Sequence, residues 1–170
     1  MKLKTPLTIN GKEYRAGEDV RWTLIYPFFL LHMGMFGGSG FFMAYADKPP
    51  PIAFLYAHGG IAICVYVVFY LSIFGREEVK WMLINAALGV FGIYTEMGWM
   101  LSLFGKSLSN YPLYLHVIPF LYYVLYTFLL RQAVLDITGA RDDEAKRINV
   151  ERCYIGGSLA IYLLFHFLKA

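Results

Sequence analysis

Charged side chains are scarce in this sequence. Only 16% of its 170 residues are Asp, Glu, Lys or Arg, whereas a soluble domain carries about 25%. Hydrophobic residues make up 58% of the chain, and its mean hydropathy is +0.51. Uncharged runs account for this deficit, and a run of about 20 residues is long enough to cross the hydrocarbon core of a bilayer. The composition therefore predicts a polytopic membrane protein and leaves no room for a separate soluble domain.

Several motifs that carry chemistry are also absent. The sequence has no P-loop, no GxGxxG, no GxSxG and no CxxCH, which argues against a nucleotide-driven pump or a stand-alone hydrolase. Its two cysteines, Cys64 and Cys153, are not spaced as a metal pair and do not indicate a disulfide framework. The Lys and Arg residues flank the apolar runs instead of forming a patch, so we expect no nucleic-acid partner.

The apolar runs predict an all-α fold, a polytopic integral membrane bundle of about five transmembrane helices within 22–170. The expected spans are 22–45, 52–74, 81–104, 111–130 with a helical extension to 137, and a helix from 142 to 169. Thr138 and Gly139 supply a stop after the fourth span. Residues 1–21 form a polar N-terminal segment in which 7–14 is expected to be a hairpin around an Asn-Gly turn.

The Lys and Arg residues also predict an orientation. Nearly all of them lie in 1–21, in the turn 75–80 and in 131–152, and the opposite side holds only Lys48, Lys106 and Lys169. Positive residues concentrate on the cytoplasmic side of a membrane protein. We therefore expect a plasma (inner) membrane protein with its N-terminus in the cytoplasm and its C-terminus outside.

Each expected span nevertheless contains one ionisable side chain. These are His32, His58, Glu96, His116 and His166. A rise of 1.5 Å per residue places the last four roughly 5–8 Å outward of the midplane, with His32 near the midplane. Ionisable groups at such depths are costly unless they are paired or bound, so they mark functional sites.

Small and polar residues accompany these side chains at helical spacing. On the third span Asn85, Gly89, Gly92 and Glu96 share one face, which is the composition that a membrane helix turns toward other helices. Similar faces occur on the other spans, so we expect the ionisable residues to converge in the interior of the bundle.

The sharpest interpretation of such a layer is a haem or metal site. Imidazole is the usual axial ligand of b-type haem, and Gly59 and Gly60 directly after His58 could admit a macrocycle, with Lys48 and Lys106 near its propionates. His-bearing spans in a five-helix bundle resemble the small cytochrome b membrane-anchor subunits of fumarate reductases and succinate dehydrogenases. The resemblance is architectural and carries no sequence motif. It implies an electron-transfer subunit that binds haem b and meets quinone, with His32, His58, His116 and His166 as the ligand candidates.

Other interpretations stay open. His58, His116 and His166 with Glu96 could hold Zn, Cu or Fe, although no single helix carries an HxxxH or ExxH pair. Glu96 could carry protons or act as a base beside quinol. Alternatively, the histidines are interhelical hydrogen-bond partners, and the chain is a non-catalytic structural or assembly subunit that packs against other subunits of a membrane complex or against its own copies.

Overall fold

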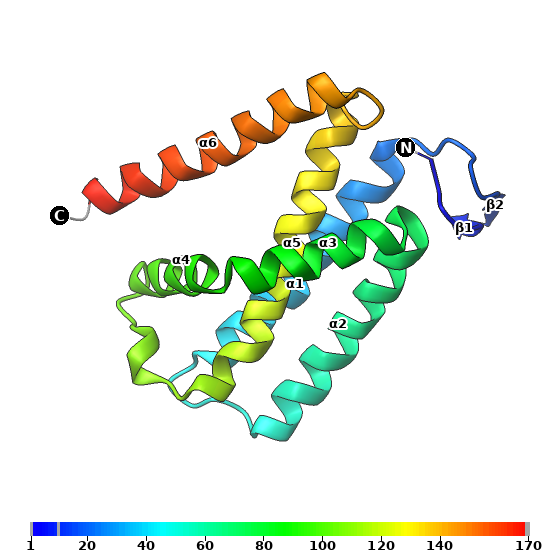
Figure 1. Ribbon diagram of the computed structural model, residues 1–170. Helices are drawn as coiled ribbons and strands as arrows, with labels where there is room; N and C mark the ends of the chain where they lie inside the picture. The colour runs from blue at the N-terminus through cyan, green and yellow to red at the C-terminus, as the bar shows by residue number, and fades with distance from the viewer. Residues whose placement is uncertain (1, 10, 169–170) are drawn as a thin grey trace. The chain divides into compact units, whose positions relative to one another are not determined.

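The computed structural model describes residues 2–9 and 11–168 (Figure 1). The side chains at 9, 158, 161, 162, 165, 166 and 168 lie outside the description. The described chain is all-α, with a short N-terminal hairpin and six α-helices. It divides into two compact units, Met1–Phe128 and Leu129–Ala170, and each unit is described by itself.

The N-terminal segment contains the predicted hairpin. Strand β1 (Leu7–Ile9) pairs with β2 (Lys12–Tyr14) in antiparallel register, and Gly11 in the turn has a φ of 79°, a conformation that favours glycine. The segment is tied to the first unit, because both the backbone N–H and the hydroxyl of Thr5 donate to the Ser72 carbonyl oxygen. The hairpin prediction is confirmed, although Asn10 of its turn lies outside the described residues.

Three long apolar helices match three predicted spans. They are α1 (Trp22–Ala44), α2 (Ile52–Phe74) and α5 (Leu113–Ile137). Each is long and apolar enough to cross a bilayer, and together they identify an integral membrane protein. The prolines at 49–51 separate α1 from α2 as expected, because proline cannot continue a helix.

Two hydrogen bonds fix the direction of α5 relative to α2. The Tyr56 hydroxyl donates to the Tyr114 carbonyl near the start of both helices, and the Tyr70 hydroxyl donates to the Leu125 carbonyl further along. The two helices therefore run parallel. The segment between them has to return the chain from the end of α2 to the level at which α2 begins.

That return is made by two short helices rather than one span. Helix α3 (Arg76–Leu88) and helix α4 (Val90–Ser102) are separated at Gly89, and Figure 1 shows them following one another with a bend between them. The prediction of one continuous helix over 81–104 is therefore wrong. Gly89 has φ −92° and ψ 9°, away from helical values, and glycine costs about 1 kcal/mol in a helix interior.

The second unit contains the end of α5, a turn and helix α6 (Glu144–Leu168). Gly139 in the turn has a φ of 64°, so the predicted stop after the fourth span is confirmed. Helix α6 is continuous, as expected from the sequence. It has 25 residues and is long enough to span, but among the described residues its composition is not apolar enough for a membrane span, so three helices rather than five qualify.

The core of the first unit depends on close approach of α1, α2 and α5. Gly59 lies against Ile118, where an added Cβ would be 2.4 Å from the Ile118 Cγ2 atom. Gly37 and Gly40 press against the ring of Tyr122 in the same way, at 3.2 and 3.3 Å. Small residues at these positions bring the helix backbones together.

Candidate functional site

His116 lies in a buried polar cluster at the C-terminal end of α1. Its Nδ1 atom is 2.8 Å from the hydroxyl of Tyr45, and the two residues are only 4% and 3% exposed. Burial, followed by the neighbouring Tyr94 and Tyr111, raises the pKa of the Tyr45 hydroxyl. The hydroxyl therefore stays protonated and can donate its hydrogen to the imidazole.

The backbone of Tyr45 is held as firmly as its side chain. Its carbonyl oxygen accepts hydrogen bonds from the Lys106 ammonium at 2.6 Å and from the Tyr111 hydroxyl at 3.0 Å. Lys106 also binds Asp47 at 2.8 Å, and this contact lowers the pKa of Asp47 and raises that of Lys106. Lys106 therefore ties the loop after α4 to the loop after α1, and its predicted contact with haem propionates stays a prediction.

The imidazole of His116 is surrounded by partners from its own chain. The ring of Tyr94 meets it edge-on, with the ring centroids 5.6 Å apart, and the backbone carbonyls of Tyr111 and Leu108 lie beside it. These contacts join α1, α4 and α5. His116 is thus enclosed by groups that satisfy it, and its placement serves the packing of three helices.

His32 and His58 have a different environment. Both are half-exposed. His32 on α1 has its Nδ1 atom 2.8 Å from the Phe28 carbonyl oxygen of its own helix. His58 on α2 lies parallel to the ring of Phe54, with ring centroids 5.9 Å apart, and also contacts Phe36 of α1. Within the described chain no hydrogen bond or ion pair reaches the imidazole of His58.

Glu96 on α4 is half-exposed as well. Its neighbour Met97 is buried against the rest of the unit, so the carboxylate stands at the edge of the buried face of α4. No hydrogen bond or ion pair to Glu96 is formed by the part of the chain that the structure describes. This is an uncommon state for a carboxyl on an apolar helix.

Three of the predicted residues occupy one level of the first unit. Gly59, directly after His58, contacts Ile118, and Tyr94, two residues before Glu96, contacts His116. His58 and Glu96 therefore both lie within about one helical turn of the His116–Ile118 level on α5.

Sharing a level does not bring these side chains together. Of the described ionisable residues from the predicted layer, His116 alone is buried. Nowhere among the described residues do three or more His, Cys, Asp or Glu side chains gather in a way that could hold a metal ion. The side chain of His166 lies outside the described residues, so its predicted part in the site stays a prediction.

Sequence reasoning missed Tyr45 and Lys106 as members of this cluster. A tyrosine near the end of an expected span is more typical of an interfacial anchor, and a lone lysine in a polar loop carries no pairing signal. Their roles depend on which loops meet in space, and no spacing in the sequence encodes that. For the site as a whole the sequence carried one signal, which was the equal depth expected for His58, Glu96 and His116.

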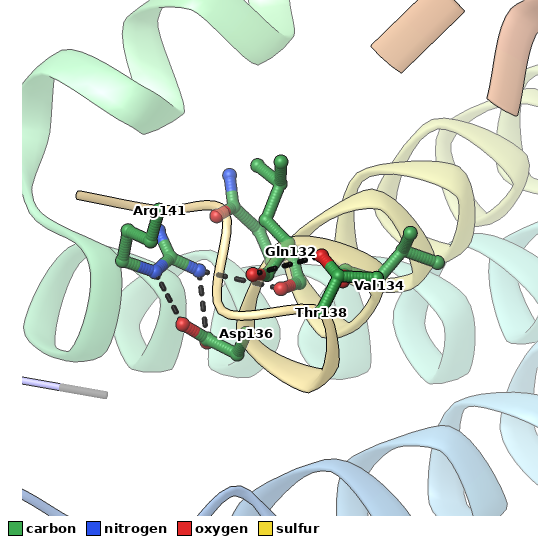
Figure 2. Close-up of polar contacts among 6 residues, drawn as sticks. Gln132, Val134, Asp136, Thr138 and Arg141 are labelled. Atoms are coloured by element: carbon green, nitrogen blue, oxygen red, sulfur yellow. Dashed lines mark hydrogen bonds and ion pairs between the residues drawn. The ribbon is translucent and has the colours of Figure 1, made fainter. Parts of the chain in front are cut away.

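The second unit has its own polar cluster at the turn between α5 and α6. Arg141 donates to both carboxylate oxygens of Asp136, at 2.5 and 2.9 Å, and to the Gln132 carbonyl, as Figure 2 shows. The Thr138 hydroxyl donates to the Val134 carbonyl at 2.7 Å in the same turn. Bidentate pairing of this kind fixes geometry well, so the cluster holds the turn.

A further ion group lies beside that turn. Glu151 on α6 pairs with Arg131 of α5 and with Arg147, the latter at 3.1 Å. Burial opposes ionisation of Glu151, but the two guanidinium groups outweigh it and lower the pKa of this carboxyl. These charges satisfy one another and hold the start of α6 against the end of α5.

No family model, curated protein or solved structure matches this chain.

Proposed function

We propose that this protein is a non-catalytic integral membrane subunit that packs against other membrane helices in a larger assembly. The observation that carries the proposal is the environment of His116. The buried histidine of the predicted layer is bonded to Tyr45 and enclosed by its own chain. It acts as an interhelical hydrogen-bond partner, which is a common use of histidine in membrane bundles.

The direction of the helices supports a four-crossing arrangement of the first unit. Since α2 and α5 run parallel and each is long enough to span, the pair α3–α4 carries the chain back across the bilayer. Each of the two helices has 13 residues, or about 20 Å, so neither spans alone. The distribution of Lys and Arg favours a cytoplasmic N-terminal segment.

The middle of this broken crossing supports a role in packing against partners. None of the described side chains from 83 to 96 is buried, and Leu88 and Phe91 are 80% and 85% exposed. The two short helices are anchored near their outer ends, by Val79 and Met82 on α3 and by Met97 and Leu101 on α4. Exposed side chains on both helices leave surface for neighbouring helices.

Purification of the tagged protein in a mild detergent tests this proposal. We expect membrane polypeptides, either other subunits or further copies of this chain, to co-purify at a fixed stoichiometry. We also expect the reduced-minus-oxidised visible spectrum to lack haem bands. A particle that contains one copy of this chain and nothing else would contradict the proposal.

A second candidate function is the electron-transfer subunit predicted from the sequence, with haem b and quinone. The surroundings of His32 and His58 favour it. The Nδ1 atom of His32 faces a backbone carbonyl, an arrangement that leaves Nε2 free to bind a metal, and His58 on the adjacent helix has no hydrogen-bond partner among the described residues. Gly60 beside it faces open space. On this proposal Glu96 would serve quinone as a proton acceptor.

The same purification separates the two functions. Stoichiometric b-type bands that disappear in His32→Ala or His58→Ala, but persist in Phe91→Ala, would establish the redox function and overturn the first proposal. Elemental analysis of the same sample tests the third interpretation, in which Zn, Cu or Fe is bound.

A further inference from the structure

His58 and Glu96 are two polar groups that the described residues of their own chain leave without hydrogen-bond or ion-pair partners. Each is half-exposed on an apolar helix, and no hydrogen bond or ion pair from the described residues reaches either one. A polar side chain left in this state in hydrocarbon is costly, and such residues pair with one another or with a ligand. Groups other than the described residues of the same chain are therefore required to satisfy them.

The two groups are chemically complementary. An imidazole N–H donates to a carboxylate, and a protonated imidazole also forms an ion pair with it. His32 is a weaker candidate for the same contact, because its Nδ1 atom already faces the Phe28 carbonyl. His116 is excluded because it is buried against Tyr45.

The two groups also lie at one level. His58 is next to Gly59, which contacts Ile118. Glu96 lies two residues after Tyr94, whose ring contacts that of His116. Copies that insert into a membrane in the same orientation are related by rotation about the membrane normal, so each residue keeps its depth in every copy. Complementary residues at one level are what such an assembly needs for a contact between copies.

We propose that His58 of one copy of this chain pairs with Glu96 of a second copy within the membrane. This inference rests on the proposed function and names the partner as the chain itself. The pair needs no polypeptide other than this one, and it places the exposed middle of the α3–α4 crossing next to α2 of the neighbouring copy.

Cysteine crosslinking in native membranes tests the contact. Cys64 and Cys153, both free and exposed, are first replaced by serine. Full-length chains carrying His58→Cys and Glu96→Cys on different tags are then co-expressed and oxidised. We expect a disulfide-linked species that carries both tags. The matched control is Phe91→Cys in place of Glu96→Cys. Phe91 lies on the same helix and is more exposed than Glu96, so exposure alone would favour the control. We expect at least tenfold less crosslinked product from the control than from Glu96→Cys.

Exchange of the two side chains provides a second readout. The copy number per particle is measured in nanodiscs for the wild type, for His58→Glu, for Glu96→His and for the double exchange. We expect at least two copies in the wild type, at least a tenfold loss of association in each single variant, and restored association in the double exchange.

These outcomes also separate this inference from the proposed function. A particle that contains one copy of this chain together with a different polypeptide would overturn the pairing and leave the proposed function in place. Association that survives both single substitutions, or crosslinking no stronger than with Phe91→Cys, would likewise overturn the pairing.

Discussion

His116 and His58 lie at one level of the molecule but have different environments within the membrane helices. His116 is 4% exposed and bonded to Tyr45. His58 is half-exposed, and among the described residues it meets only the aromatic rings of Phe54 and Phe36. The sequence neighbourhoods of the two are equally apolar. The difference between them arises from the loops, since the loop after α1 places Tyr45 beside His116, whereas none of the described loop residues places a donor or acceptor beside His58.

The comparison indicates how polar residues in this bundle divide their roles. A group that its own chain satisfies fixes the packing of helices, as a hydrogen bond across an interface does. A group that its own chain leaves unsatisfied directs the molecule toward a partner. Depth and residue type are shared by both classes, so only the contacts separate them.

The largest effect is expected from the glycines next to His58. Gly59→Ala places a Cβ 2.4 Å from Ile118, and such overpacking costs about 2–3 kcal/mol. Gly60→Ala is the matched control, because its Cβ meets open space and alanine gains up to about 1 kcal/mol of helix propensity. Unfolding in detergent measures both. Similar stability of the two variants would contradict the close contact of α2 with α5 that sets the level of His58.

The next effect concerns the partner of His116. Tyr45→Phe removes the hydroxyl but keeps the ring, and it leaves a buried imidazole nitrogen unsatisfied, which costs about 1–3 kcal/mol. A double-mutant cycle with His116→Phe measures the coupling. We expect the second substitution to cost little once the first is present. Independent, additive losses would show that the two side chains do not act together.

The smallest effect is expected at the exposed edge of the same cluster. Lys106 lowers the pKa of Asp47, so the folded value lies below the unfolded value of about 3.9. The contribution of this pair to stability is complete above the unfolded value and is lost as the pH falls through the folded one. NMR titration of the Asp47 carboxyl should give a low midpoint that Lys106→Met returns to the ordinary range. An unchanged midpoint in that variant would refute the contact.

Much of the fold could be predicted from the sequence, because hydrophobic run length and helix-stop residues act locally. The bounds of α1, α2 and α5 follow from uncharged runs that prolines, charges and glycines terminate. The break at Gly89 was missed, since a single glycine within an apolar run is compatible with a continuous helix.

The candidate site was less predictable. The shared level of His58, Glu96 and His116 follows from counting residues along helices. Which of them turns inward depends on Tyr45 and Lys106, whose loops meet only in the folded chain.

Parallel unfolding of His116→Phe and His58→Phe in a harsh detergent chosen to separate the copies tests the central distinction most directly. The account predicts that His116→Phe lowers the free energy of unfolding by about 1–3 kcal/mol, because it removes a buried hydrogen bond. His58→Phe is predicted to change it by less than about 0.5 kcal/mol, as for a surface substitution. Equal losses of unfolding free energy in the two variants would contradict the account, in which His116 stabilises the fold and His58 does not.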